Sequence, residues 1–63
     1  MSEYRCYFLD YRHYVVATRI ITCESDDAAR AIADDLLEEN VYLAVEVWAD
    51  YRQVHEKKRP API

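Results

Sequence analysis

The chain has 63 residues, of which 52% are hydrophobic and 32% charged, and its formal net charge at pH 7 is −4. This length predicts one small domain, and the composition is ordinary for a globular protein. No apolar run approaches the roughly 18 residues of a membrane span, and residues 1–8 lack the basic and apolar segments of a secretory signal. We therefore expect a cytoplasmic protein with no membrane partner.

Two strands are predicted first, "YRCYFLD" at residues 4–10 and "HYVVATRIITCE" at residues 13–24, because both segments are rich in aromatic and β-branched residues. Asp10 suits the first position of a type I turn. The chain contains no glycine, which disfavours the tightest hairpin turns and favours a slightly longer connection.

The same hairpin bears on the two cysteines, Cys6 and Cys23. If Asp10 pairs with His13, Cys6 lies opposite Ala17, and Cys23 lies beyond the start of the first strand. That separation exceeds the roughly 7 Å between Cα atoms that a disulfide tolerates. We expect both thiols to be free and buried as small hydrophobic residues.

An acidic amphipathic helix is predicted over residues 25–40. Ser25 or Asp26 can cap its start, and Asp26 and Asp27 in the first turn suit the helix dipole. Asn40 is a candidate left-handed terminator. Apolar residues recur at three- and four-residue spacing and form one stripe: Ala28, Ala29, Ile32, Ala33, Leu36 and Leu37. The polar outer face is predicted to carry Arg30, Asp34, Asp35 and Glu38.

A third strand is predicted over residues 41–50, "VYLAVEVWAD". Strand alternation places one set of side chains in the core, Val41, Leu43, Val45 and Val47, and the other set on the opposite face, Tyr42, Ala44, Glu46 and Trp48. Residues 53–63 follow, with Pro60 and Pro62 and a basic run. They are predicted to form a flexible tail.

These elements predict an α+β fold of order ββαβ, a three-stranded sheet with one amphipathic helix on one face. Residues 1–52 form the single domain, with the first strand expected in the centre of the sheet. Which side of the second strand packs on the helix is left open by the pattern.

The sheet face that the helix does not cover is predicted to be apolar, because the second strand carries apolar residues on both sides. An exposed patch of several hundred Å² is uncommon on a monomer, so we expect a partner, most simply a second copy in a homodimer. The expected interface residues are Tyr14, Val16, Ile20, Tyr42 and Trp48. The alternative cover is the C-terminal tail folding back.

Few residues suggest chemistry. Cys6, His13, Cys23 and His55 lack metal-ligand spacing, and a chain without glycine lacks phosphate-binding loops. We expect no enzyme activity, no cofactor and no metal. Residues 1–50 carry four arginines against eleven carboxylates, a balance of −7 that argues against nucleic acid as a partner. A small flat ligand held between Tyr42 and Trp48 of two subunits is the sharper alternative.

The segments "YRCYFLD", "ITCESDDAARAIADDLL" and "AVEVW" together resemble a group of short proteobacterial proteins, many from rhizobia and relatives, over residues 4–50. Members typically carry an aromatic–Phe–Leu–Asp hairpin with a turn glycine, an acidic helix start and a "VEVW" strand. The turn "DYRH" departs from this pattern because it lacks the glycine. The group has no assigned activity, so the resemblance implies the fold and the origin alone.

A fainter similarity is to the antitoxin family with a degraded ribonuclease-H-like core, on the helix "DDAARAIADDLLEE" after a hairpin. The Gly/Pro-rich segment that precedes the helix in that family is missing here. The leading expectation is a non-enzymatic, homo-oligomeric interaction or accessory protein. The alternatives are a small-ligand binder with an aromatic interface site and an antitoxin-like regulator of a protein partner.

Overall fold

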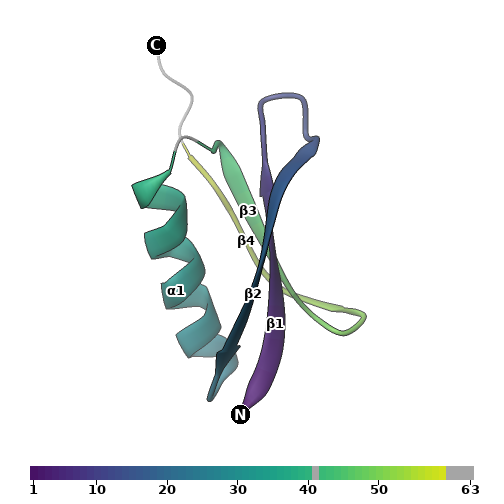
Figure 1. The fold of residues 1–63 in the computed structure, drawn as a ribbon, viewed down its shortest axis with the longest axis vertical. Helices are drawn as coiled ribbons and strands as arrows, with labels where there is room; N and C mark the ends of the chain where they lie inside the picture. Colours follow the sequence, from purple (N-terminus) through teal and green to yellow (C-terminus); the bar gives the residue numbers. More distant parts are fainter. Residues whose placement is uncertain (41, 60–63) are drawn as a thin grey trace.

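The computed structural model describes residues 1–40 and 42–59 and shows one helix packed on one face of a twisted sheet (Figure 1). The elements are β1 (Ser2–Leu9), β2 (Val15–Cys23), α1 (Asp26–Glu39), β3 (Ala44–Ala49) and β4 (Arg52–Lys58). The sheet is antiparallel, with strand order β2-β1-β3-β4. The α+β class and the position of β1 between β2 and β3 are confirmed, but the sheet has four strands and not the predicted three.

The additional strand β4 occupies most of the segment predicted to be a flexible tail, so that prediction is wrong for residues 53–58. β4 pairs with β3 from Ala49↔Arg52 to Ala44↔Lys58. Its sequence, "RQVHEKK", has one aliphatic residue, Val54, which packs at the margin of the core. Hydrophobic periodicity therefore could not reveal it. The predicted features at Val41 and at residues 60–63 lie outside the described residues.

β4 has no apolar face, and its side chains contact α1 through polar groups. Arg52 Nη1 lies 3.0 Å from Asp26 Oδ2 near the start of the helix. Halfway along, His55 Nε2 lies 3.0 Å from Asp34 Oδ1. Asp34 was predicted on the solvent face, but it is half-buried and faces β4. The acidic helix thus holds a basic strand against the sheet edge.

The end of α1 is capped by the residue that follows β4. The Arg59 guanidinium donates to the carbonyl oxygens of Leu37 and Asn40, and a cation there also suits the helix dipole. Asn40 has φ −123°, so the predicted left-handed terminator is wrong. Its side-chain amide donates to Leu36 O at 2.7 Å, and its backbone N–H donates to Leu37 O.

The start of α1 follows the sequence prediction. Ser25 is the N-cap, and its hydroxyl accepts a hydrogen bond from the Ala28 N–H at 3.2 Å. The predicted apolar stripe faces the sheet, with Ala29, Ala33 and Leu37 buried. The two alanines have no side-chain atoms beyond Cβ, so they allow the helix to approach the strands closely.

The core lies between α1 and the near face of the sheet. It contains alternate residues of β1 and β3, the buried helix residues and one residue of β2: Tyr4, Cys6, Phe8, Cys23, Ala29, Ala33, Leu37, Val45 and Val47. Both cysteines are free and buried, as expected. Ala17 and Ile21 of β2 pack against this cluster, which resolves the open question of which side of the second strand faces the helix.

The first hairpin is closed by Asp10, whose Oδ1 accepts hydrogen bonds from the N–H groups of Arg12 at 2.8 Å and Tyr14 at 3.1 Å. His13 has φ 65°, the left-handed region that glycine adopts without strain. The loop pairs Asp10 with Tyr14, not with His13, and this adds one residue to the register.

A bulge near Val16 adds a second residue, so Cys6 lies opposite Arg19 and not the predicted Ala17. A shift of one residue would have exchanged the two faces of β2. Because the total shift is two, the alternation of the strand relative to β1 is kept.

Candidate interaction surface

The sheet face away from α1 is divided between an apolar side and a polar side. On β1, Tyr4, Cys6 and Phe8 face the helix, so strand alternation turns Arg5 and Tyr7 to the open face. Register extends this face to Thr18 and Ile20 of β2 and to Glu46 and Trp48 of β3, which are the partners of those β1 residues. The apolar residues gather toward β2 and the charged ones toward β4.

Trp48, one of the predicted interface residues, lies among polar neighbours on this face. It is half-buried, and its indole N–H donates to Glu46 Oε1 at 3.0 Å. Its partner on β1 is the exposed Arg5. The indole therefore has a hydrogen-bond partner within its own chain and does not join the apolar residues of β2.

Tyr42, a second predicted interface residue, lies on the opposite side of the sheet. β3 begins at Ala44, so Tyr42 precedes the strand and its alternation. Its ring packs on Phe8 with the centroids 5.0 Å apart, at the edge of the core. Tyr42 and Trp48 of one chain thus lie on different faces of the sheet.

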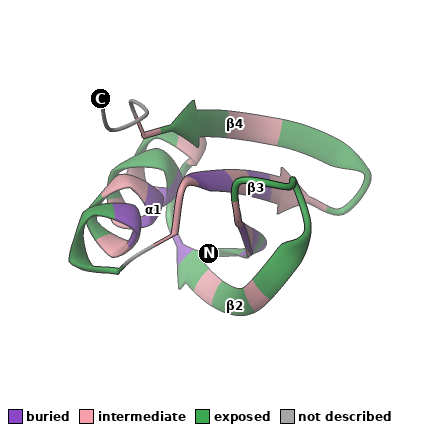
Figure 2. Cartoon of the chain, turned by 90° about the horizontal axis from the view of Figure 1, so that it is seen from above, coloured by how far each residue is buried: buried purple, intermediate pink, exposed green. Residues whose placement is uncertain are grey.

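The other three predicted residues, Tyr14, Val16 and Ile20, do lie together along one sheet edge. With Val15 they form what we call the β2 patch, where the exposed fractions are 64% for Tyr14, 54% for Val15, 50% for Val16 and 57% for Ile20. Figure 2 shows β2 as a mostly exposed ribbon, in contrast to β3, whose residues are buried or intermediate. Val15 was missed because the bulge changes the alternation at this end of β2.

The two outer strands of the sheet differ in chemistry. β2 pairs within the described residues only with β1, and so leaves one side of its backbone unpaired. Between Val15 and Cys23 its single charged residue is Arg19. β4, on the other edge, carries four charged residues and His55 within seven positions. Charged side chains on an edge oppose strand addition, so β2 is the edge that can accept another strand.

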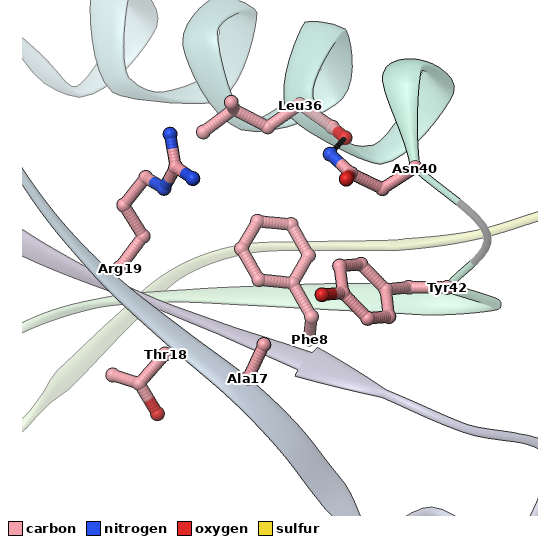
Figure 3. A pocket seen from close by; sticks show the side chains of 7 residues that line it. All are labelled: Phe8, Ala17, Thr18, Arg19, Leu36, Asn40 and Tyr42. Atoms are coloured by element: carbon pink, nitrogen blue, oxygen red, sulfur yellow. Dashed lines mark hydrogen bonds between the residues drawn. The ribbon is translucent and has the colours of Figure 1, made fainter.

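A small hollow opens beside β2 under the C-terminal half of α1 (Figure 3). The Phe8 ring lies at its centre, between Arg19 on one side and Tyr42 on the other, with Leu36 and Asn40 above. Its volume of about 60 Å³ is far below the roughly 300–1,000 Å³ of a typical ligand pocket. The hollow has room for a few water molecules and not for a flat metabolite.

The strongest polar network links β1, α1 and β4. The Tyr4 hydroxyl donates to Asp26 Oδ1 at 2.7 Å, and Arg52 donates to Asp26 Oδ2 at 3.0 Å. The Arg52 hydrogen bond, followed by that from Tyr4, lowers the pKa of Asp26, and the bond to Asp26 raises the pKa of Tyr4. Burial raises the pKa of the Cys6 thiol. The pKa shifts of Asp26 and Tyr4 follow from packing of the helix start on the sheet.

No group of three or more His, Cys, Asp or Glu residues is placed to hold a metal ion in the part of the chain that the structure describes. The one helix in residues 1–40 and 42–59 is too short and too polar to cross a membrane. Comparison of the chain with protein-family models, curated proteins and solved structures gave no match.

Proposed function

We propose that this protein is a self-associating interaction module and that two copies join through the β2 edge. The observation that supports this proposal is the coincidence, on one strand, of an unpaired backbone edge with the exposed apolar side chains of the β2 patch. Three of the five interface residues expected from the sequence belong to that patch. Trp48 and Tyr42 have partners elsewhere in the chain.

The area of the patch fits a modest dimer. Its four residues together expose roughly 450 Å² per copy, and pairing of two strand edges covers only part of that area, so the interface is smaller than the roughly 1,200 Å² of standard complexes. Interfaces of that size commonly bind in the micromolar range. A chain of 63 residues also buries only about 60% of its unfolded surface, so association adds a useful increment of burial.

The experiment compares Ile20→Lys with Gln53→Lys by sedimentation equilibrium over a range of protein concentrations. Both positions are exposed strand positions, one on each edge of the sheet. Each Ile20 exposes roughly 100 Å², and covering about half of that area in both copies contributes about 2.5 kcal/mol at 25 cal/mol/Å². We expect Ile20→Lys to weaken the dimer roughly a hundredfold, and Gln53→Lys to leave it unchanged.

Two results would contradict the proposal. One is a wild-type chain that stays monomeric up to about 1 mM, where even a weak homodimer becomes visible. The other is an equal effect of the two lysine substitutions, which would place the contact away from β2. Circular dichroism of each variant checks that the fold is retained, since an exposed substitution usually costs less than about 0.5 kcal/mol.

A further inference from the structure

If β2 pairs with the β2 strand of a second copy, side-chain alternation and the bulge near Val16 allow only a few registers. This inference rests on the proposed function and specifies the geometry of the contact. In an antiparallel pair related by a two-fold axis, opposite residue numbers add to a constant. That constant must be even, because opposite side chains have to share a sheet face.

The bulge near Val16 limits the usable length of the edge. From Ala17 to Cys23 the register with β1 is regular, from Phe8↔Ala17 to Ser2↔Cys23. On the N-terminal side of the bulge, Leu9 pairs with Val15, and Val16 is the extra residue. The alternation of side chains is offset there, so residues 14 and 15 cannot continue a pairing that matches faces within residues 17–23.

We infer that two copies pair antiparallel along Ala17–Cys23, with Ile20 opposite the Ile20 of the second copy on the two-fold axis. This register is centred on the regular segment and uses all seven of its residues. On the open face it places the two Ile20 side chains in contact and Thr18 opposite the second copy's Thr22. Both kinds of cross-strand pair, between two β-branched apolar residues and between two threonines, are favourable in sheets.

The neighbouring registers are less favourable for identifiable reasons. Centring the pair on Arg19 places two guanidinium groups directly opposite each other, which destabilises a sheet. If the two-fold axis passes through Thr18, opposite side chains share a sheet face only within residues 16–20. Val15 would lie opposite Ile21, and the bulge shifts the alternation of side chains between Val15 and the rest of the strand. Centring it on Ile21 places Thr18 opposite Glu24, one residue past the end of β2.

The position of the single charge on this edge also favours a second copy as its occupant. In the inferred register Arg19 lies opposite Ile21, so the single charge of the segment meets an uncharged side chain in both directions. The result is one continuous sheet with both helices on the same side.

The register is tested by disulfide trapping of full-length Ile20→Cys and Thr18→Cys in a glutathione redox buffer. Directly opposite residues have Cα atoms about 4.5–5.5 Å apart, inside the limit of about 7 Å for a disulfide. In the inferred register the two residue-18 positions are displaced by four residues, or about 13 Å along the strand. Wild-type protein, whose two cysteines are buried, is the control for background oxidation.

We expect Ile20→Cys to form covalent dimer at least about ten times faster than Thr18→Cys, as the distance limit on the bond requires. Faster trapping of Thr18→Cys would overturn the register while leaving self-association intact. Trapping of neither variant, in a chain that sedimentation shows to be dimeric, would overturn the inferred register. A wild-type chain that is monomeric in sedimentation would overturn both this inference and the proposed function.

Discussion

Leu37→Ala tests the arrangement of the helix on the sheet, because Leu37 and its neighbour Leu36 have different surroundings. Leu37 is 2% exposed and belongs to the core, whereas Leu36 is half-buried and borders the hollow beside β2. Replacing a fully buried leucine with alanine costs about 2.7–5 kcal/mol, from lost transfer free energy and the remaining cavity. A domain of this length has a free energy of unfolding of roughly 3–9 kcal/mol.

We therefore expect Leu37→Ala to remove about half or more of the stability, and Leu36→Ala to cost roughly 1–2 kcal/mol. The helix propensity change is the same in both variants, so the difference between them reports burial. Urea unfolding followed by Trp48 fluorescence and by circular dichroism measures both values. Equal destabilisation by the two substitutions would refute the packing direction of α1.

Two further predictions concern single positions. His13→Gly should raise the free energy of unfolding by roughly 0.5–1 kcal/mol, because His13 has φ 65° and glycine adopts that conformation without strain; a loss of stability in urea unfolding would show that the imidazole contributes more than its backbone costs. Asp26→Asn should reduce stability most above the ordinary carboxyl pKa of 3.8, since the folded state lowers the pKa of Asp26 and that contribution disappears as pH falls through the lowered value. Acid titration of both proteins measures it, and a difference that does not shrink below pH 3.8 would contradict the Asp26–Arg52 contact.

Elements with a hydrophobic period were predictable from the sequence. The stripe on α1, the Ser25 cap and the core positions Val45 and Val47 agree with the structure. Alternation also predicted the exposed side chains of Val16, Thr18 and Ile20 on β2, because the shift in register was even, but it missed Val15. Tyr42 was misplaced because the alternation was extended back past Ala44, where β3 begins.

β4 was missed because its apolar content is low and its side-chain contacts to α1 are polar. The relevant signal was the charge asymmetry, with −7 in residues 1–50 and +3 in residues 51–63. An acidic helix and a basic segment of similar length predict contact within one chain, as Arg52 shows with Asp26 and Lys57 with Asp34. Single-residue patterns do not reveal which distant charges meet. The bulge near Val16 was likewise unpredictable, since a bulge has no hydrophobic period of its own.

The two edge strands of the sheet differ in charge, and in the proposed dimer this difference would limit the number of subunits. A protein whose sheet accepts another strand at both edges can add subunits repeatedly and form filaments, as cross-β assemblies do. Between Val15 and Cys23, β2 carries one charged residue, whereas β4 carries four: Arg52, Glu56, Lys57 and Lys58. A dimer formed through β2 would use that edge strand of both subunits. The charged strand β4 would then lie at each end of the joined sheet, where charged side chains oppose the addition of another strand. In the proposed dimer, the charged strand β4, which also contacts the helix, would therefore limit assembly to two subunits.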